Sequence, residues 1–241
     1  MKYIWIILFF MLIMGGCADD TVSTECVGEI IDIENDVVIP KAYDVILKDI
    51  YDALQSEEPL YDVENEYFSL GIMEEVMSIS SAEDRLKAIA YCIMDINKDG
   101  VEELLIVVPN HAKSGCVIIL DMYTIIEEMP VKVTEGWSRN RVYLLEDGVI
   151  YIVSSGGACY TNLELLSLEP GTDRLTTKEL YFTYPKGDNM TECGYYYSEN
   201  GVYDVASAVE ISGAEFEEFF DACNSINVEF EATTFDGYNA N

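Results

Sequence analysis

The stretch AIAYCIMDINKDGVEELLIVV at residues 88–108 decides how this chain folds. Its two ends, Ala88–Met94 and Leu104–Val108, are apolar and partly β-branched, which is typical of buried strands. The acidic segment DINKDGVEE stands between them, at 95–103. The sequence therefore predicts a strand, a loop rich in oxygen-bearing side chains, and a second strand.

The loop carries oxygen donors at a spacing that suits a hard cation. The expected ligands are the side chains at loop positions one, three, five and nine and the backbone carbonyl at position seven: Asp95, Asn97, Asp99, Glu103 and Val101. Calcium takes six to eight oxygen ligands at about 2.3–2.6 Å, and Gly100 permits the left-handed backbone of a sharp bend. We therefore expect a structural calcium ion here; the alternative is an acidic turn that binds no metal.

The loop differs from an EF-hand in its length and its surroundings. An EF-hand closes with a bidentate Glu at position twelve, where this chain has Ile106, and its flanks are helices. The segment DINKDGVEELLI at 95–106 resembles instead the D-x-[DN]-x-D-G-x-x-[DE] calcium loops of integrin-type and FG-GAP/VCBS-type repeat proteins. It resembles still more closely a set of uncharacterised bacterial surface lipoproteins with a DINGDGxxELLI segment. The resemblance implies a calcium loop on a β-hairpin. A propeller carries several such loops, whereas this sequence has one, so we do not expect a full propeller.

The N-terminus has the features of a lipoprotein signal peptide. Lys2 precedes twelve unbroken apolar residues, Tyr3–Met14, a run shorter than the ~20 residues of a membrane-spanning helix. The following Gly15-Gly16-Cys17 resembles the lipobox that lipoprotein signal peptidase cleaves, although Met14 replaces the more usual Leu. We expect diacylglycerol on Cys17; the alternatives are ordinary secretion and a short membrane anchor.

These features divide the chain and place it outside the cytoplasm. We expect a signal peptide at 1–16, a flexible tether at 17–40 and a single domain at 41–241, held by lipid on the extracytoplasmic face of the cell membrane. The 45 acidic and 13 basic residues give a net charge of −32, which repels nucleic-acid phosphates and anionic lipid headgroups. The expected partners are the membrane, through the lipid, and a glycan or protein ligand, but no nucleic acid.

Cysteine usage fits an oxidising compartment. Besides Cys17 the chain has an even six cysteines: Cys26, Cys92, Cys116, Cys159, Cys193 and Cys223. Disulfides are permitted outside the membrane, and six cysteines allow 15 pairings, between which the sequence does not choose. Cys159 and Cys193 stand beside turn-like segments and are accessible candidates, whereas a cysteine in an apolar run can remain a free, buried thiol.

Hydrophobic periodicity predicts helices near both ends and strands between them. A helical stripe covers Lys41–Ser56, short helices are expected at Glu74–Ser78 and Ala82–Lys87, and a capping box at Ser212 begins a helix through Asn224. Hairpins are expected around three turn signals, and a last strand at the C-terminal end: Glu146–Gly148, Pro170–Thr172, Glu199–Gly201 and Val228–Thr234. The fold class expected is α+β, mostly an antiparallel β meander with an N-terminal helix and a C-terminal helix.

Catalytic motifs are weak in this sequence. The sole histidine, His111, stands in a polar loop without a nucleophile elbow, so we expect no enzymatic activity. The aromatic residues of Tyr195–Tyr197 and Tyr181–Tyr184 fit either a sugar- or peptide-stacking face or a cross-strand ladder in the core. The predicted function is a lipid-anchored, non-enzymatic binding module with a structural calcium loop. The alternatives are a secreted hydrolase that uses paired carboxylates on glycans and a structural component of an envelope complex.

Overall fold

The computed structural model describes residues 39–57, 60, 65–109, 117–187, 192–225 and 231–238. Cys17, Cys26, His111 and Cys116 lie outside these ranges, as do the expected signal peptide and most of the expected tether. Residues Val37–Asn241 belong to one compact unit, and the description below concerns this unit alone. Among the described residues, none of the helices combines the length and the apolar character needed to cross a membrane.

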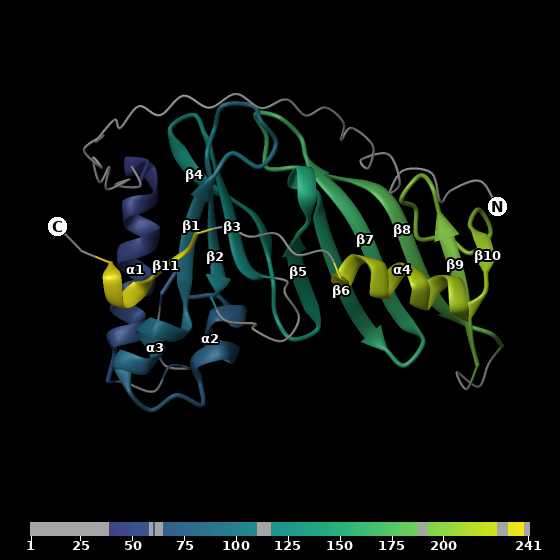
Figure 1. Cartoon of the computed structure of the whole chain (residues 1–241), viewed down its shortest axis with the longest axis horizontal. Helices are drawn as coiled ribbons and strands as arrows, with labels where there is room; N and C mark the ends of the chain where they lie inside the picture. The colour runs from purple at the N-terminus through teal and green to yellow at the C-terminus, as the bar shows by residue number, and fades with distance from the viewer. Residues whose placement is uncertain are drawn as a thin grey trace, which may run out of the picture. The chain divides into compact units, whose positions relative to one another are not determined.

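Among the described residues, eleven strands join in one antiparallel sheet, in the order β10-β9-β8-β7-β6-β5-β3-β2-β1-β11, with β4 paired to β3 beside this path (Figure 1). The prediction of an α+β fold with a mostly antiparallel sheet is confirmed. Most strands pair with their neighbours in the chain. Their bounds are β1 Ala90–Met94, β2 Glu103–Val108, β3 Ile118–Ile126, β4 Met129–Glu135, β5 Asn140–Leu144, β6 Ile150–Gly157, β7 Tyr160–Leu168, β8 Leu175–Pro185, β9 Cys193–Ser198, β10 Val209–Ile211 and β11 Thr233–Thr234.

Most helices precede the first strand in the sequence or lie in its C-terminal part. The expected helix at Lys41 is present as a 3-10 turn, η1, followed by α1, and the expected capping box starts α4, where the Ser212 hydroxyl accepts from the Glu215 N–H at 3.2 Å. The short helix expected at Glu74 begins earlier, because Ser69 caps it by accepting from the Ile72 N–H at 3.4 Å. The bounds are η1 Lys41–Tyr43, α1 Asp44–Gln55, α2 Leu70–Val76, α3 Ala82–Ala88, η3 Glu146–Gly148, α4 Gly213–Ser225 and η4 Phe235–Gly237.

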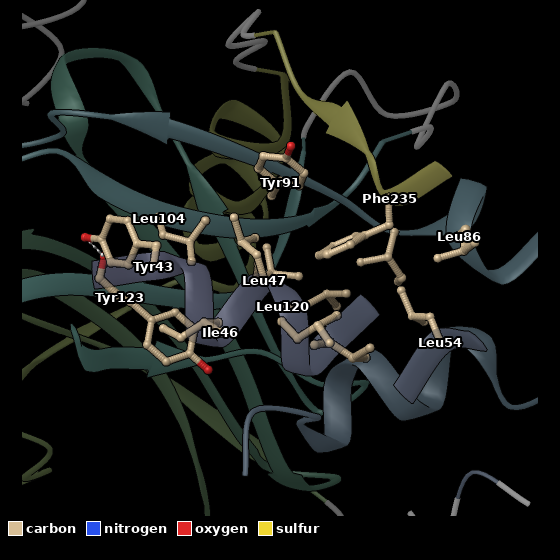
Figure 2. Packing of buried hydrophobic residues seen from close by; sticks show 14 of the residues in the cluster. Tyr43, Ile46, Leu47, Leu54, Leu86, Tyr91, Leu104, Leu120, Tyr123 and Phe235 are labelled. Carbon is tan, nitrogen blue, oxygen red and sulfur yellow. Dashed lines mark hydrogen bonds between the residues drawn. The ribbon is translucent and has the colours of Figure 1, made fainter. Parts of the chain in front are cut away.

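The helix α1 packs on the β1–β3 end of the sheet through its apolar stripe (Figure 2). Ile46, Leu47 and Leu54 are fully buried there, against Leu104 of β2. The Tyr43 hydroxyl donates to the Glu102 carbonyl at 2.7 Å, which joins the start of the helix to the end of the acidic loop. This core therefore fixes the strand on which the loop closes.

The C-terminal residues complete the same core. The two-residue strand β11 pairs with β1, and the Phe235 N–H donates to the Ile89 carbonyl at 3.1 Å. The Phe235 ring is fully buried and lies 5.3 Å from the Tyr91 ring in an edge-on contact. Within the described residues the last strand is shorter than the expected Val228–Thr234, of which residues 228–230 lie outside the described ranges.

The helix α4 covers one face of β6–β9. Phe216 and Cys223 are buried in a cluster with Tyr151 and Leu163, and Phe219 stacks on Tyr181 with ring centroids 3.8 Å apart. On the same strands Phe182 stacks against Tyr196, its cross-strand partner, at 5.3 Å. The interpretation of these aromatic residues as a cross-strand core ladder is confirmed for the buried pair Phe182 and Tyr196, whereas Tyr184 is exposed. Of Tyr195–Tyr197, Tyr196 is buried, whereas Tyr195 and Tyr197 are half-buried and contact Phe216 and Tyr181, respectively.

The third expected hairpin does not form. Residues Val202–Ala206 contain no strand, and β9 pairs instead with β10 further along the chain. The Val202 N–H donates to the Ser198 hydroxyl at 3.0 Å and to Asn200 Oδ1 at 3.2 Å, so local side chains take the donor that a strand would use. The segment that follows folds over the sheet and packs Val205 and Ala208 on Phe182 and Tyr196.

One disulfide joins Cys159, in the β6–β7 turn, to Cys193 at the start of β9, with Cα atoms 5.3 Å apart. These are the two cysteines that the turn-like sequence marked as accessible. Cys92 and Cys223 are buried, and burial raises the pKa of the Cys92 thiol to about 12, which keeps it neutral and unreactive. The structure thus selects one pairing that the sequence left open.

Candidate functional site

The acidic loop lies between β1 and β2, as the sequence predicts. These strands are antiparallel neighbours, and their last pair is Met94 with Glu103, so residues 95–102 form the connection. The predicted ligand positions Asp95, Asn97, Asp99 and Val101 all stand in this connection, while Glu103 is the first residue of β2. Strand pairing therefore brings the two ends of the donor set together.

Side chains at the start of the loop turn inward onto its own backbone. The Asp99 N–H donates to both Asp95 Oδ1 at 3.2 Å and Asn97 Oδ1 at 3.1 Å, so these two oxygens share one donor. The second Asp95 oxygen accepts from the Gly100 N–H at 2.9 Å. Gly100 has φ of +92° and Lys98 of +62°, so the expected left-handed bend is present at Gly100 and in a second residue.

The Asp99 carboxylate ties the loop to a distant turn. It accepts from the Val101 N–H at 2.8 Å and from the N–H of Gly171, in the β7–β8 turn, at 2.7 Å. Burial alone would raise the pKa of Asp99, but these two N–H groups and the Asn97 amide favour the charged form and lower it below its usual value. Asp99 is therefore an anion that also orders the loop.

Glu103 is a fully buried carboxylate. Its oxygens accept from the Ile96 N–H at 2.9 Å and from the Thr124 hydroxyl at 3.0 Å. Burial raises the pKa of Glu103, and the charges of Asp99 and Asp95 add to this effect, against the two hydrogen bonds that lower it. Among the described residues no Lys or Arg forms an ion pair with Glu103.

The loop also packs against the turn that joins β5 to β6. Gly148 has φ of +73°, and a Cβ built on it would lie 2.0 Å from the carbonyl oxygen of Ile96. Lys98 reaches over the same turn, with its Nζ 3.7 Å from Asp147 Oδ1. The backbone of the loop therefore has a neighbour on each side, at Gly148 and at Gly171.

The predicted ligands could hold a cation only if carboxylate oxygens and neutral oxygen donors bind it together. Within the described ranges, no three side chains of His, Cys, Asp or Glu are gathered as a metal-holding group. A carboxylate oxygen has about two acceptor sites, and each oxygen of Asp95 and Glu103 accepts one hydrogen bond, which leaves capacity for a cation. A bound ion would thus also need the Asn97 amide and the Val101 carbonyl, the neutral donors that the sequence predicts.

A second candidate site is an open groove of about 510 Å³ on the sheet. Asn140, Ser154 and Asn162 are directly opposed on β5, β6 and β7, so they form one row across its floor. Trp137 and Arg139 line the groove from the turn before β5, and Tyr160 and Tyr203 line it from β7 and from the segment after β9. Ser155 and Gly156 complete the lining.

Comparisons of the chain with protein-family models, with curated proteins and with solved structures find no match. Function is therefore inferred from the chemistry of the loop and the groove. None of the nine described residues that line the groove is acidic, so these nine do not include the carboxylate pair of a glycoside hydrolase.

Sequence reasoning missed the groove and a buried ion pair. Asp121 on β3 is fully buried, and Lys132 on β4 places its Nζ 2.9 Å from Asp121 Oδ1 and 3.0 Å from a Glu135 oxygen. Burial raises the pKa of Asp121 to about 6, although the Lys132 charge and the Ser69 hydroxyl act to lower it. The signal available in the sequence was the isolated Asp121 within the apolar run Ile118–Ile126.

Proposed function

We propose that this protein is a lipid-anchored, non-enzymatic binding module of the extracytoplasmic face, in which the loop at 95–103 holds one calcium ion that stabilises the sheet. The observation that carries the calcium part is Glu103, a buried carboxylate beside two further acidic residues. Like charges at a buried position are costly unless a cation compensates them. Calcium bound to Asp95, Asn97, Asp99, Glu103 and the Val101 carbonyl would supply that charge.

The position of the loop explains how one ion could stabilise a large part of the fold. The loop is bonded to the β7–β8 turn through Asp99 and Gly171, and to the start of α1 through Glu102 and Tyr43. Ordering the loop would therefore order contacts between segments that are far apart in the sequence. The proposed role of the ion is structural; a catalytic ion would need an open coordination position for its substrate.

Calcium is expected to raise the thermal stability of the full-length protein in detergent. Calcium sites of extracellular modules often have dissociation constants of about 10⁻⁴–10⁻³ M. With about 2 mM Ca²⁺ and a dissociation constant near 0.1 mM, mass action adds about 1.8 kcal/mol to the free energy of unfolding. For a domain of this size that is roughly 4–7 °C in Tm, measured by calorimetry in CaCl₂ and in EGTA.

The variant Asp95→Ala separates the loop from nonspecific calcium effects. It lowers Tm in EGTA as well, because Asp95 accepts two backbone N–H groups, but it is expected to lose the calcium-dependent increase. Asp173→Ala removes an exposed aspartate from the β7–β8 turn and is expected to keep that increase. An unchanged Tm in calcium for the unaltered protein would refute calcium binding and leave the acidic-turn alternative.

The lipid anchor is expected to depend on Cys17. Each buried methylene contributes about 0.8 kcal/mol, and two acyl chains hold a protein stably where one does not. Cys17→Ser should therefore move the protein from the membrane fraction to the soluble fraction of cells, and remove its labelling by a radioactive fatty acid. Membrane association that persists without labelling would indicate the short-anchor alternative instead.

A further inference from the structure

The groove floor presents polar groups that the protein itself leaves unused. Within the described ranges, the side chains of Ser154 and Asn162 form no hydrogen bond, and Asn140 uses only its amide N–H, which donates to the Glu135 carbonyl at 2.8 Å. The three residues lie in one row on neighbouring strands about 4.8 Å apart. They therefore offer amide and hydroxyl groups along roughly 10 Å of sheet surface.

Aromatic rings border this floor, and contacts with neighbouring residues hold these rings in place. The Tyr203 hydroxyl donates to the Thr183 carbonyl at 3.3 Å, and its ring lies 4.5 Å from the Phe182 ring. The Tyr160 ring contacts Tyr184 edge-on at 5.8 Å. Trp137 is 37 % exposed at the other end of the floor. Rings that are ordered before binding lose little conformational entropy when a ligand stacks on them.

The turn at the Trp137 end is also fixed. The Trp137 and Asn140 backbones exchange hydrogen bonds of 2.9 Å in each direction, and the Ser138 N–H donates to Glu74 at 2.8 Å. The Arg139 guanidinium donates through Nε to the Ser155 carbonyl at 3.0 Å, which spans the turn and β6. The groove is thus built from segments that are bonded to one another, and Arg139 keeps further N–H donors for a ligand.

The chemistry of the lining indicates the class of ligand. Stacking rings beside amide, hydroxyl and guanidinium groups match a molecule that has C–H faces and many hydroxyl groups. Among the described residues, the lining has no acidic side chain to hold a cation, while the net charge of −32 opposes a polyanion. A peptide that adds a strand to a sheet would pair with a strand edge, but this floor is a sheet face. We infer that the groove binds a neutral oligosaccharide. This inference rests on the proposed role as a binding module.

Binding can be followed through Trp137 itself. The chain has two tryptophans, Trp5 and Trp137, and Trp5 lies in the expected signal peptide at 1–16. In the variant Trp5→Phe the emission therefore reports on the groove alone, whether or not the signal peptide has been removed. The probes are hexasaccharides of glucose, xylose, mannose and N-acetylglucosamine, titrated into the protein in detergent with fluorescence and calorimetric detection. At least one is expected to shift the emission of Trp137 and to give a saturable heat of binding.

Variants test whether the groove is the binding site. Trp137→Ala and Asn162→Ala should each weaken calorimetric binding about tenfold or more, since each removes a stacking or hydrogen-bonding group. Phe220→Ala is the matched control, because Phe220 is exposed to the same extent, 38 % against 37 %, but stands on α4. It should bind as the unaltered protein does.

The outcomes separate this inference from the calcium proposal. Thermal unfolding of the same samples shows whether each variant is folded and whether it responds to calcium. A folded protein that responds to calcium but binds none of the four hexasaccharides would overturn the inference and leave the calcium proposal intact. Binding that survives both groove substitutions would overturn the placement of the site, as would binding of a peptide at the groove without any saccharide.

Discussion

Alanine in place of Gly148 is expected to destabilise this protein by about 3 kcal/mol or more. The new Cβ would lie 2.0 Å from the carbonyl oxygen of Ile96, and backbone cannot move aside as a flexible side chain can. The φ of +73° at Gly148 adds strain for any residue with a Cβ. Because Ile96 stands in the acidic loop, the displacement should also weaken the response to calcium that we propose for this loop. Denaturant unfolding with and without calcium measures both effects.

Gly171→Ala is the matched control for this substitution. Gly171 has a similar φ of +69°, but nothing lies within 4 Å of its Cβ position, so only the backbone strain of about 1 kcal/mol is expected. The alanine N–H can still donate to Asp99. Equal losses of stability in the two variants would show that the turn yields to Ile96, and that the close approach of turn and loop does not stabilise the fold.

Methionine in place of Lys132 is expected to cost about 3–5 kcal/mol at neutral pH. Lys132 is the cation beside Asp121, a fully buried carboxylate, and its removal leaves that charge without compensation. Glu135 is the other acidic neighbour and repels the same charge. The substitution should therefore be far more damaging than Lys48→Met, which breaks an exposed pair with Asp52 on α1 and should change stability little.

The loss of stability in Lys132→Met should depend on pH in a defined direction. The pKa of Asp121 in the folded protein is about 6, above its ordinary value of 3.8, so the folded state binds this proton more tightly than the unfolded state does. The contribution of Asp121 to stability therefore falls as pH rises from about 4 through 6. In Lys132→Met the pKa should rise further, so its deficit should be small at pH 4.5 and large at pH 7.5. A deficit independent of pH would argue that Lys132 acts through packing alone.

Local patterns in the sequence sufficed for much of the fold. The strand–loop–strand unit at 88–108 was predictable because both flanks are apolar and the loop carries its turn residue, Gly100. The helices at Lys41 and Ser212 were predictable from a helical stripe and a capping box, respectively. The predicted ligand positions lie within nine residues, so their proximity after folding followed from one hairpin. The hairpin expected at Val202 failed because turn chemistry around Gly201 does not determine which segment pairs with β9.

The groove could not be predicted because its parts meet only through long-range pairing. Asn140, Ser154 and Asn162 become neighbours when three strands adopt one register, and a shift by one residue would place them on the other face. Tyr203 reaches the groove because the segment after β9 folds back over the sheet. Lys132 likewise meets Asp121 only when β4 pairs with β3. Each of these contacts depends on tertiary structure that has no local signature.

The position of β11 has a consequence for the order in which the protein folds. Most of the sheet pairs neighbours along the chain and can form hairpin by hairpin, with small loss of chain entropy. The core under α1 is different, because Phe235 and β11 come from the end of the chain and pack beside its first strand. A chain that emerges from a ribosome or a membrane pore, N-terminus first, can complete this core only after β11 and Phe235 have emerged.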